Sequence, residues 1–297
     1  MRSITTIYPI ALLFIYLFDT GTVVAASKTV EQRLAESVIR NVPENVPQWL
    51  SSEKDKFLTL FDSDMTGNPR GGAILLPPLG AHPDWPGVMH HLRTTLPRYG
   101  WSTLSIQMPV LDDDSTLNDY LKIEPSTSKR INAAIAFMHS KGYRNIAIIG
   151  KGVGAAAGAA YLAKGTDANK VHAFIGISMS GHSEVGGWLY SPNSISKLAL
   201  PILDIYGSHD HYHVLNSADA RADAARQASL TASGNFNNSV FQRSATAESA
   251  QTRRSGYIAF RRMKIIGANV HFSGAEEKLT KRVIGWLKQH AGGIAVN

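Results

Sequence analysis

The chain contains no cysteine. Disulfide bonds and thiolate metal sites are therefore excluded, and the folded protein must be held together by core packing alone. It also lacks a long basic run interleaved with aromatic residues, although its formal net charge is +7. Its basic residues are scattered in short groups, such as Arg253 with Arg254 and Lys281 with Arg282. This distribution is typical of a solvated cationic surface, so we expect no nucleic-acid partner.

Long hydrophobic runs are scarce as well. The longest, from Ile7 to Phe18, is too short for a comfortable transmembrane helix. It follows Arg2 and precedes small residues at positions 24–26, which is the order of a secretory signal peptide. We therefore predict a signal peptide at residues 1–26, a periplasmic or secreted mature chain, and no integral membrane span after cleavage. The alternative is an uncleaved N-terminal anchor.

The remaining chain is long enough for one large domain with a sizeable core. Apolar strands alternate along it with amphipathic helices. We predict strands at 56–61, 73–76, 101–106, 145–149, 171–177, 202–206 and 263–266, and helices at 29–42, 88–96, 128–139, 155–163 and 276–289. This alternation predicts an α/β fold, with a mostly parallel sheet and helices on both faces, in a single domain at 27–297. The polar stretch 231–255 has little apolar periodicity, so we expect a flexible insertion there.

One glycine motif sits between a predicted strand and a predicted helix. It reads Gly150-Lys151-Gly152-Val153-Gly154, in the context of a nucleophile elbow, G-x-S-x-G. The outer glycines allow a sharp turn and close packing of the helix on the sheet. The central residue, Gly152, has no side chain and cannot attack a carbonyl.

The order of the other polar loops resembles that of the α/β-hydrolase superfamily. Asp210 follows the strand at 202–206, where the triad acid is expected, and His271 follows the last strand, where the triad histidine is expected. The resemblance implies that both are triad remnants. The loop after strand 73–76 begins with two prolines, which cannot donate an N–H. The amides of Leu79 and Gly80 could still serve an oxyanion hole.

A closer resemblance lies in three segments. Residues 80–86, Gly-Ala-His-Pro-Asp-Trp-Pro, together with Leu92-Arg93 and residues 100–109, resemble an uncharacterised family of exported bacterial α/β-hydrolase-like proteins. The resemblance runs from about Trp49 to the C-terminus. It implies the fold and export, and it supplies no substrate.

Four residues are expected to contribute binding groups to the cleft of such a protein: Leu79, Gly80, Val153 and His82. We predict no metal ligand and no cofactor. His82, together with Asp84 and Trp85, has a purely structural alternative, in which these residues cap the following helix and pack its start.

The missing hydroxyl at Gly152 favours a non-catalytic protein that binds a small-molecule or envelope-derived ligand in the former active-site cleft. The alternative is a working hydrolase of an ester or envelope component with an unrecognised nucleophile or metal. Ser178 and Ser180 follow a neighbouring strand and are the candidate nucleophiles, although nothing in the sequence marks either as activated.

Two further patterns in the sequence suggest other functions, a metal site and a dinucleotide-binding site. His209, His211 and His213 alternate, and imidazoles on one side of an extended segment suit a metal ion. We favour the alternative, a polar loop that follows a strand. The glycine motif also fits the loose dinucleotide-binding pattern. The acid expected near the end of the next strand is missing, because residues 177–180 read Ile-Ser-Met-Ser.

Overall fold

The computed structural model describes residues 29–53, 55–78, 80–111, 114–165, 171–241 and 258–291, with the backbone alone for 232–241. The predicted signal peptide lies outside these residues, as does most of the predicted insertion at 231–255. Residues 231–241, which we expected to be flexible, instead continue helix α8 (Ala218–Phe241). No proline interrupts residues 218–241, so nothing in the backbone stops the helix at 230.

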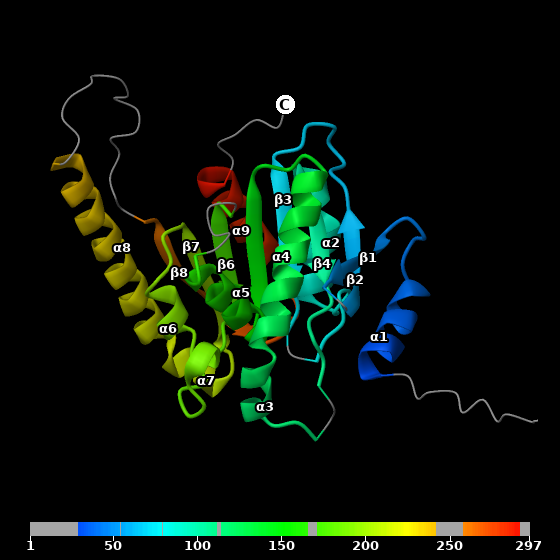
Figure 1. Cartoon of the computed structure of the whole chain (residues 1–297), viewed down its shortest axis with the longest axis horizontal. Coiled ribbons are helices and arrows are strands. Elements are labelled where there is room, and N and C mark those ends of the chain that lie inside the picture. Colours follow the sequence, from blue (N-terminus) through cyan, green and yellow to red (C-terminus); the bar gives the residue numbers. More distant parts are fainter. Residues whose placement is uncertain are drawn as a thin grey trace, which may run out of the picture.

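An eight-stranded sheet forms the centre of the molecule, in the order β1-β2-β4-β3-β5-β6-β7-β8 (Figure 1). The two N-terminal strands pair antiparallel, β1 with β2 and β2 with β4, and every pairing from β4 to β8 is parallel. The strands are β1 (Pro47–Ser52), β2 (Asp55–Asp62), β3 (Gly71–Leu76), β4 (Trp101–Ile106), β5 (Ile146–Lys151), β6 (Ala173–Ile177), β7 (Ile202–His209) and β8 (Phe260–Asn269). The predicted mostly parallel sheet is therefore confirmed.

Helices cover both faces of this sheet, as its sequence requires. All residues of β3, β4, β5 and β6 are buried, which is expected of strands that are covered on both sides. One face packs against α4 (Glu124–Ser140), α5 (Val153–Ala163), α6 (Pro192–Ile195) and α8, and the other against α2 (Val88–Thr95) and α9 (Glu276–His290). The alternation along β5 shows the division, because Ile148 faces the α4–α5 side and Ile149 the α2–α9 side.

Shorter helices complete the described chain. They are α1 (Val30–Ile39), η1 (Leu96–Tyr99), α3 (Leu117–Lys122), η3 (Gly187–Leu189) and α7 (Tyr212–Asn216). A capping box begins α1: Gln32 N–H donates to Thr29 Oγ1 at 3.2 Å, and Thr29 N–H donates to Gln32 Oε1 at 3.0 Å. Within the described residues, no helix has both the length and the apolar character needed to cross a membrane.

Candidate functional site

The carboxyl ends of β5, β6 and β7 bring three loops together at one edge of the sheet. Gly152 follows β5, Ser178 follows β6 and Asp210 follows β7. Because these strands are parallel neighbours, residues 26 or more positions apart in sequence meet here. This edge is the place where an open α/β sheet positions its chemistry, so it is the candidate site.

Gly152 occupies the turn between β5 and α5. Its backbone angles, φ 58° and ψ −122°, lie in a region that residues with a side chain adopt only under strain. Two hydrogen bonds hold the turn: Gly152 N–H donates to Ile177 O at 2.9 Å, and Ser180 N–H donates to Gly152 O at 3.2 Å. The turn therefore has the sharp strand-to-helix geometry that the glycine motif predicts.

The two flanking glycines are required by packing. A Cβ at Gly150 would lie 2.4 Å from the Cα of Ala155, and one at Gly154 would lie 2.2 Å from Pro77 O. A Cβ at Gly152, by contrast, would meet only the Cβ of Pro78, at 3.6 Å, which is ordinary van der Waals contact. The elbow position therefore has room for a side chain that its neighbours lack.

The carboxylate of Asp210 is buried and accepts three hydrogen bonds. Its Oδ2 accepts hydrogen bonds from Ser178 Oγ at 2.5 Å and from Gly207 N–H at 3.1 Å, and its Oδ1 accepts one from His211 N–H at 2.9 Å. Ser178 itself has a positive φ of 47°, which is uncommon for a residue other than glycine. The sequence did not reveal this serine–aspartate pair, because it depends on which strand ends are neighbours.

Lys151 lies beside this pair at the end of β5, with 7% of its surface exposed. Burial lowers the pKa of its amine, and the Asp210 carboxylate acts in the opposite direction. Desolvation of an ammonium favours its neutral form, which is the form that can accept a proton. Lys151 and the Ser178–Asp210 pair are thus buried polar groups at the same edge of the sheet.

His271 has a different environment from the one expected of a triad base. It is exposed, and its N–H donates to the side chain of Asn269 at 3.0 Å. Among the described residues, the imidazole makes no hydrogen bond or ion pair with Asp210. The structure places both residues in the loops after β7 and β8, as predicted, but does not join them. Their role as triad remnants stays a prediction.

Of the predicted binding residues, Val153 lines a small cavity and Gly80 does not. Leu79 lies outside the described residues. Gly80 has a φ of 69° and Val153 opens α5. Val153 and its neighbours Pro77, Pro78 and Gly154 contribute to a cavity of only about 10 Å³. That volume is about one probe sphere and holds at most a single water molecule.

His82, the fourth predicted binding residue, packs edge-on against Trp85, with the ring centroids 5.4 Å apart. Its Nδ1 is buried and has no hydrogen-bond partner among the described residues. Burial lowers the pKa of the imidazole, while Asp84 acts against the shift. A neutral, partly buried ring beside a tryptophan is typical of packing, which favours the structural alternative.

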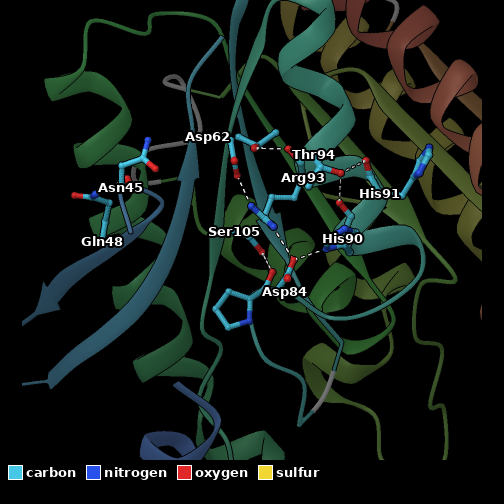
Figure 2. Close-up of polar contacts among 11 residues, drawn as sticks. Asn45, Gln48, Asp62, Asp84, His90, His91, Arg93, Thr94 and Ser105 are labelled. Carbon is cyan, nitrogen blue, oxygen red and sulfur yellow. Dashed lines mark hydrogen bonds and ion pairs between the residues drawn. The ribbon is translucent and has the colours of Figure 1, made fainter. Parts of the chain in front are cut away.

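The same loop is tied to the sheet through Arg93, as Figure 2 shows. This buried guanidinium donates to Asp84 at 2.9 Å and to Asp62 at 2.5 Å, and Asp84 also pairs with His90 at 2.7 Å. Ser105 Oγ–H on β4 donates to Pro83 O at 2.6 Å. The segments 80–86 and 92–93 therefore share a structural network that joins the loop, α2, β2 and β4.

The histidines after β7 do not converge on one point. His213 stacks on His182 with centroids 3.9 Å apart, and His211 stacks on His213 at 5.5 Å. His209 ends β7. Within the described residues, no group of three or more His, Asp or Glu side chains is arranged to hold a metal ion. Burial, and then the neighbouring His182 and His211, lower the pKa of His213 to about 4.

Comparison with protein families identifies the group to which the chain belongs. Residues 19–126 and 112–234 match the model of a family described as "Protein of unknown function (DUF3530)". The chain belongs to the DUF3530 family. The matched part of this DUF3530 chain contains the Arg93 network, the elbow at Gly152 and Asp210, and ends before His271.

Solved structures similar to this DUF3530 protein are α/β hydrolases. Est1E from Butyrivibrio proteoclasticus is 13% identical, with a TM-score of 0.56 over 82% of this chain and 98% of its own. Dienelactone hydrolase from Anabaena variabilis is 16% identical, with a TM-score of 0.59 over 83% and 99%. An α/β serine hydrolase homologue from Coxiella burnetii is 16% identical, with a TM-score of 0.54 over 82% and 98%. These likenesses confirm the α/β-hydrolase fold. A search of curated proteins finds no match.

Proposed function

We propose that this DUF3530 protein is a non-catalytic α/β-hydrolase-like protein that works in the cell envelope after export. The observation that carries the proposal is the elbow itself. Gly152 has the strained turn of a nucleophile position, with space for a side chain, and presents no hydroxyl. Serine hydrolysis has no covalent step without that group.

The state of Asp210 supports the same conclusion. A triad acid orients the imidazole of the base and stabilises its charged form. Here the carboxylate instead accepts three hydrogen bonds, from Ser178, Gly207 and His211. Three of the about four acceptor positions of the carboxylate are therefore occupied by groups other than an imidazole.

The cavity beside Val153 and Gly154 measures about 10 Å³, which is too small for a small-molecule or envelope-derived ligand. In this proposal any such ligand binds elsewhere. The envelope location rests on the charged, apolar and small-residue order of residues 1–26.

A serine-directed fluorophosphonate probe tests the missing chemistry. We expect no covalent labelling of the wild type, because the probe needs an activated hydroxyl. Gly152→Ser, confirmed as folded by circular dichroism, should also stay unlabelled while Asp210 remains bonded to Ser178. An active serine esterase in the same reaction is the positive control. Strong labelling of Gly152→Ser that disappears in Gly152→Ser/His271→Ala would instead show that base and acid persist and that the hydroxyl alone is missing.

A second candidate is a hydrolase with a relocated nucleophile. It is favoured by the 2.5 Å hydrogen bond between Ser178 Oγ and Asp210, and by the buried Lys151 at the end of the neighbouring strand, whose pKa is lowered by burial. Serine–lysine pairs are known variants of the triad. Ser178 is itself 1% exposed, which leaves a substrate no direct approach. Wild-type labelling mapped to Ser178 by mass spectrometry, and abolished by Ser178→Ala, would establish this candidate and overturn the first.

A further inference from the structure

A cationic groove lies at the opposite end of the sheet from the elbow. It is bounded by the loop between β2 and β3, by η1 and by the C-terminal part of α9. Its volume is about 410 Å³, within the range of small-molecule sites. This groove is more than an order of magnitude larger than the cavity beside Gly152.

Three cations line the groove: Arg70, Arg98 and Lys288. All three are exposed, and none makes an ion pair with a carboxylate of the described residues. No Asp or Glu lines the groove. Other arginines behave differently, since Arg93 and Arg221 are each paired with aspartates. Three unpaired cations around one hollow repel one another, and an anion between them would relieve that repulsion.

The position of Arg70 is fixed by its surroundings. Its N–H donates to Gly100 O at 2.7 Å, and its carbonyl accepts from the Asn145 side chain at 2.9 Å. A Cβ at Gly100 would lie 3.0 Å from the Cγ of Arg70, so the glycine lets the arginine stem lie across the turn. Gly100 also has a φ of 87°, which favours glycine on its own. The guanidinium is therefore presented by an ordered stem.

The loop that forms the neighbouring wall is ordered as well. Asp64 Oδ1 accepts from both the N–H and the hydroxyl of Thr66, at 3.1 Å and 2.8 Å, in a side-chain-to-backbone turn. Met65 N–H donates to Pro97 O at 3.0 Å, which ties this loop to η1. Asp64 is thereby satisfied locally, and the groove needs little rearrangement to bind a ligand.

The groove combines charge with aromatic and apolar surface. Trp101 and Ile284 line it, and so does Tyr99, a residue that is 47% exposed. Two guanidinium forks suit the geometry of phosphate oxygens, and a phosphate monoester carries close to two negative charges at neutral pH. We propose that this groove binds a phosphate monoester, carried by a small molecule or by a lipid headgroup. The proposal is independent of what happens at the elbow.

Isothermal titration of the purified full chain with phenyl phosphate tests it. We expect saturable binding, tighter than that of inorganic phosphate because the phenyl ring can lie on Tyr99 and Ile284. Arg70→Gln/Arg98→Gln/Lys288→Gln should weaken binding by about tenfold or more. The matched control is Arg261→Gln/Lys264→Gln/Lys278→Gln, which removes the same charge from exposed cations outside the groove and should bind within about twofold of wild type.

Vesicles distinguish the two sources of the phosphate. Phosphatidylcholine vesicles with and without phosphatidic acid are titrated with the same three proteins. Binding to phosphatidic acid that follows the groove variant, without binding of phenyl phosphate, assigns the site to a lipid headgroup. Saturable binding of neither probe overturns the proposal. Equal weakening by both triple variants overturns it too, because binding would then follow overall surface charge. Circular dichroism shows that each variant is folded.

Discussion

Replacing Gly152 by alanine tests the elbow geometry directly. The residue has φ 58° and ψ −122°, where a side chain costs about 1–3 kcal/mol of backbone strain. The new Cβ would meet Pro78 at 3.6 Å, so it adds no clash. The unfolded chain loses conformational freedom when glycine becomes alanine, which offsets about 0.4–1 kcal/mol. We expect Gly152→Ala to lower the free energy of unfolding by about 1–2 kcal/mol.

Gly154→Ala is the matched contrast two residues later. Gly154 is helical and buried, so helix propensity alone would favour alanine by about 1 kcal/mol. Its Cβ, however, would lie 2.2 Å from Pro77 O and 2.5 Å from Leu76 O, and backbone atoms cannot swing away as a flexible side chain can. We expect a loss of at least about 3 kcal/mol, or failure to fold.

Urea unfolding followed by far-ultraviolet circular dichroism measures both changes. Equal slopes of the free energy against urea would show that the midpoints report stability. Gly152→Ser should unfold close to Gly152→Ala, since both place one Cβ at the same point. Stabilisation by Gly152→Ala, or a loss as large as that of Gly154→Ala, would refute the reasoning that strain without a clash governs this position.

Three further predictions follow from buried charge. Arg93→Ala should cost about 3–5 kcal/mol in urea unfolding, since it leaves two aspartates without their cation; a cost under about 1 kcal/mol would contradict the network's role. Arg221→Met should cost a similar amount because Asp204 stays buried without its cationic partner. Arg221→Met/Asp204→Leu should recover most of the loss, and no recovery would contradict the pairing. The pKa of His213 is about 4 in the folded chain and about 6.5 in the unfolded chain, so the unfolded chain binds the proton more readily. The free energy of unfolding should therefore fall by about 1–2 kcal/mol as the pH is lowered from 6.5 to 4, a figure that is reduced because solvent screens the partly exposed imidazole. In His213→Phe the free energy of unfolding should fall less steeply over this pH range. An unchanged pH profile would contradict the assignment of the decline to His213.

The fold could be predicted because its central strands are buried on both faces. Uninterrupted apolar runs such as 73–76 and 145–149 have few alternatives to a parallel strand between helices. Strand β1 was missed, because Pro47 and the polar residues after it resemble a loop and the strand lies at the edge of the sheet. Helix α8 was missed because its apolar residues do not gather on one face strongly enough to give a helical period.

The site was only partly predictable from the sequence. The spacing of the glycines predicted the elbow, because Gly150 and Gly154 are required where the backbone of other segments comes close, and both lie near Gly152 in the sequence. The bond between Ser178 and Asp210 joins residues 32 positions apart and depends on β6 and β7 being neighbours. The Arg93 network likewise joins β2, a loop and α2. Such contacts leave no periodic signal in the chain, so residue order alone could suggest the acid but not its partner.

The geometry of the turn at Gly152 needs no catalytic explanation. Its turn is held by hydrogen bonds from Gly152 to Ile177 and from Ser180 to Gly152, and by the close approach of Gly150 and Gly154 to the backbone of the α5 start and of Pro77. These interactions pack α5 onto β5 and β6, whatever residue stands at the tip. A glycine there removes the strain that a serine would impose. The hydrogen bond from Ser178 to Asp210 fixes the loop after β6 in the same way. Packing and hydrogen bonding therefore account for the geometry of this edge without a catalytic requirement, in line with the proposed non-catalytic role.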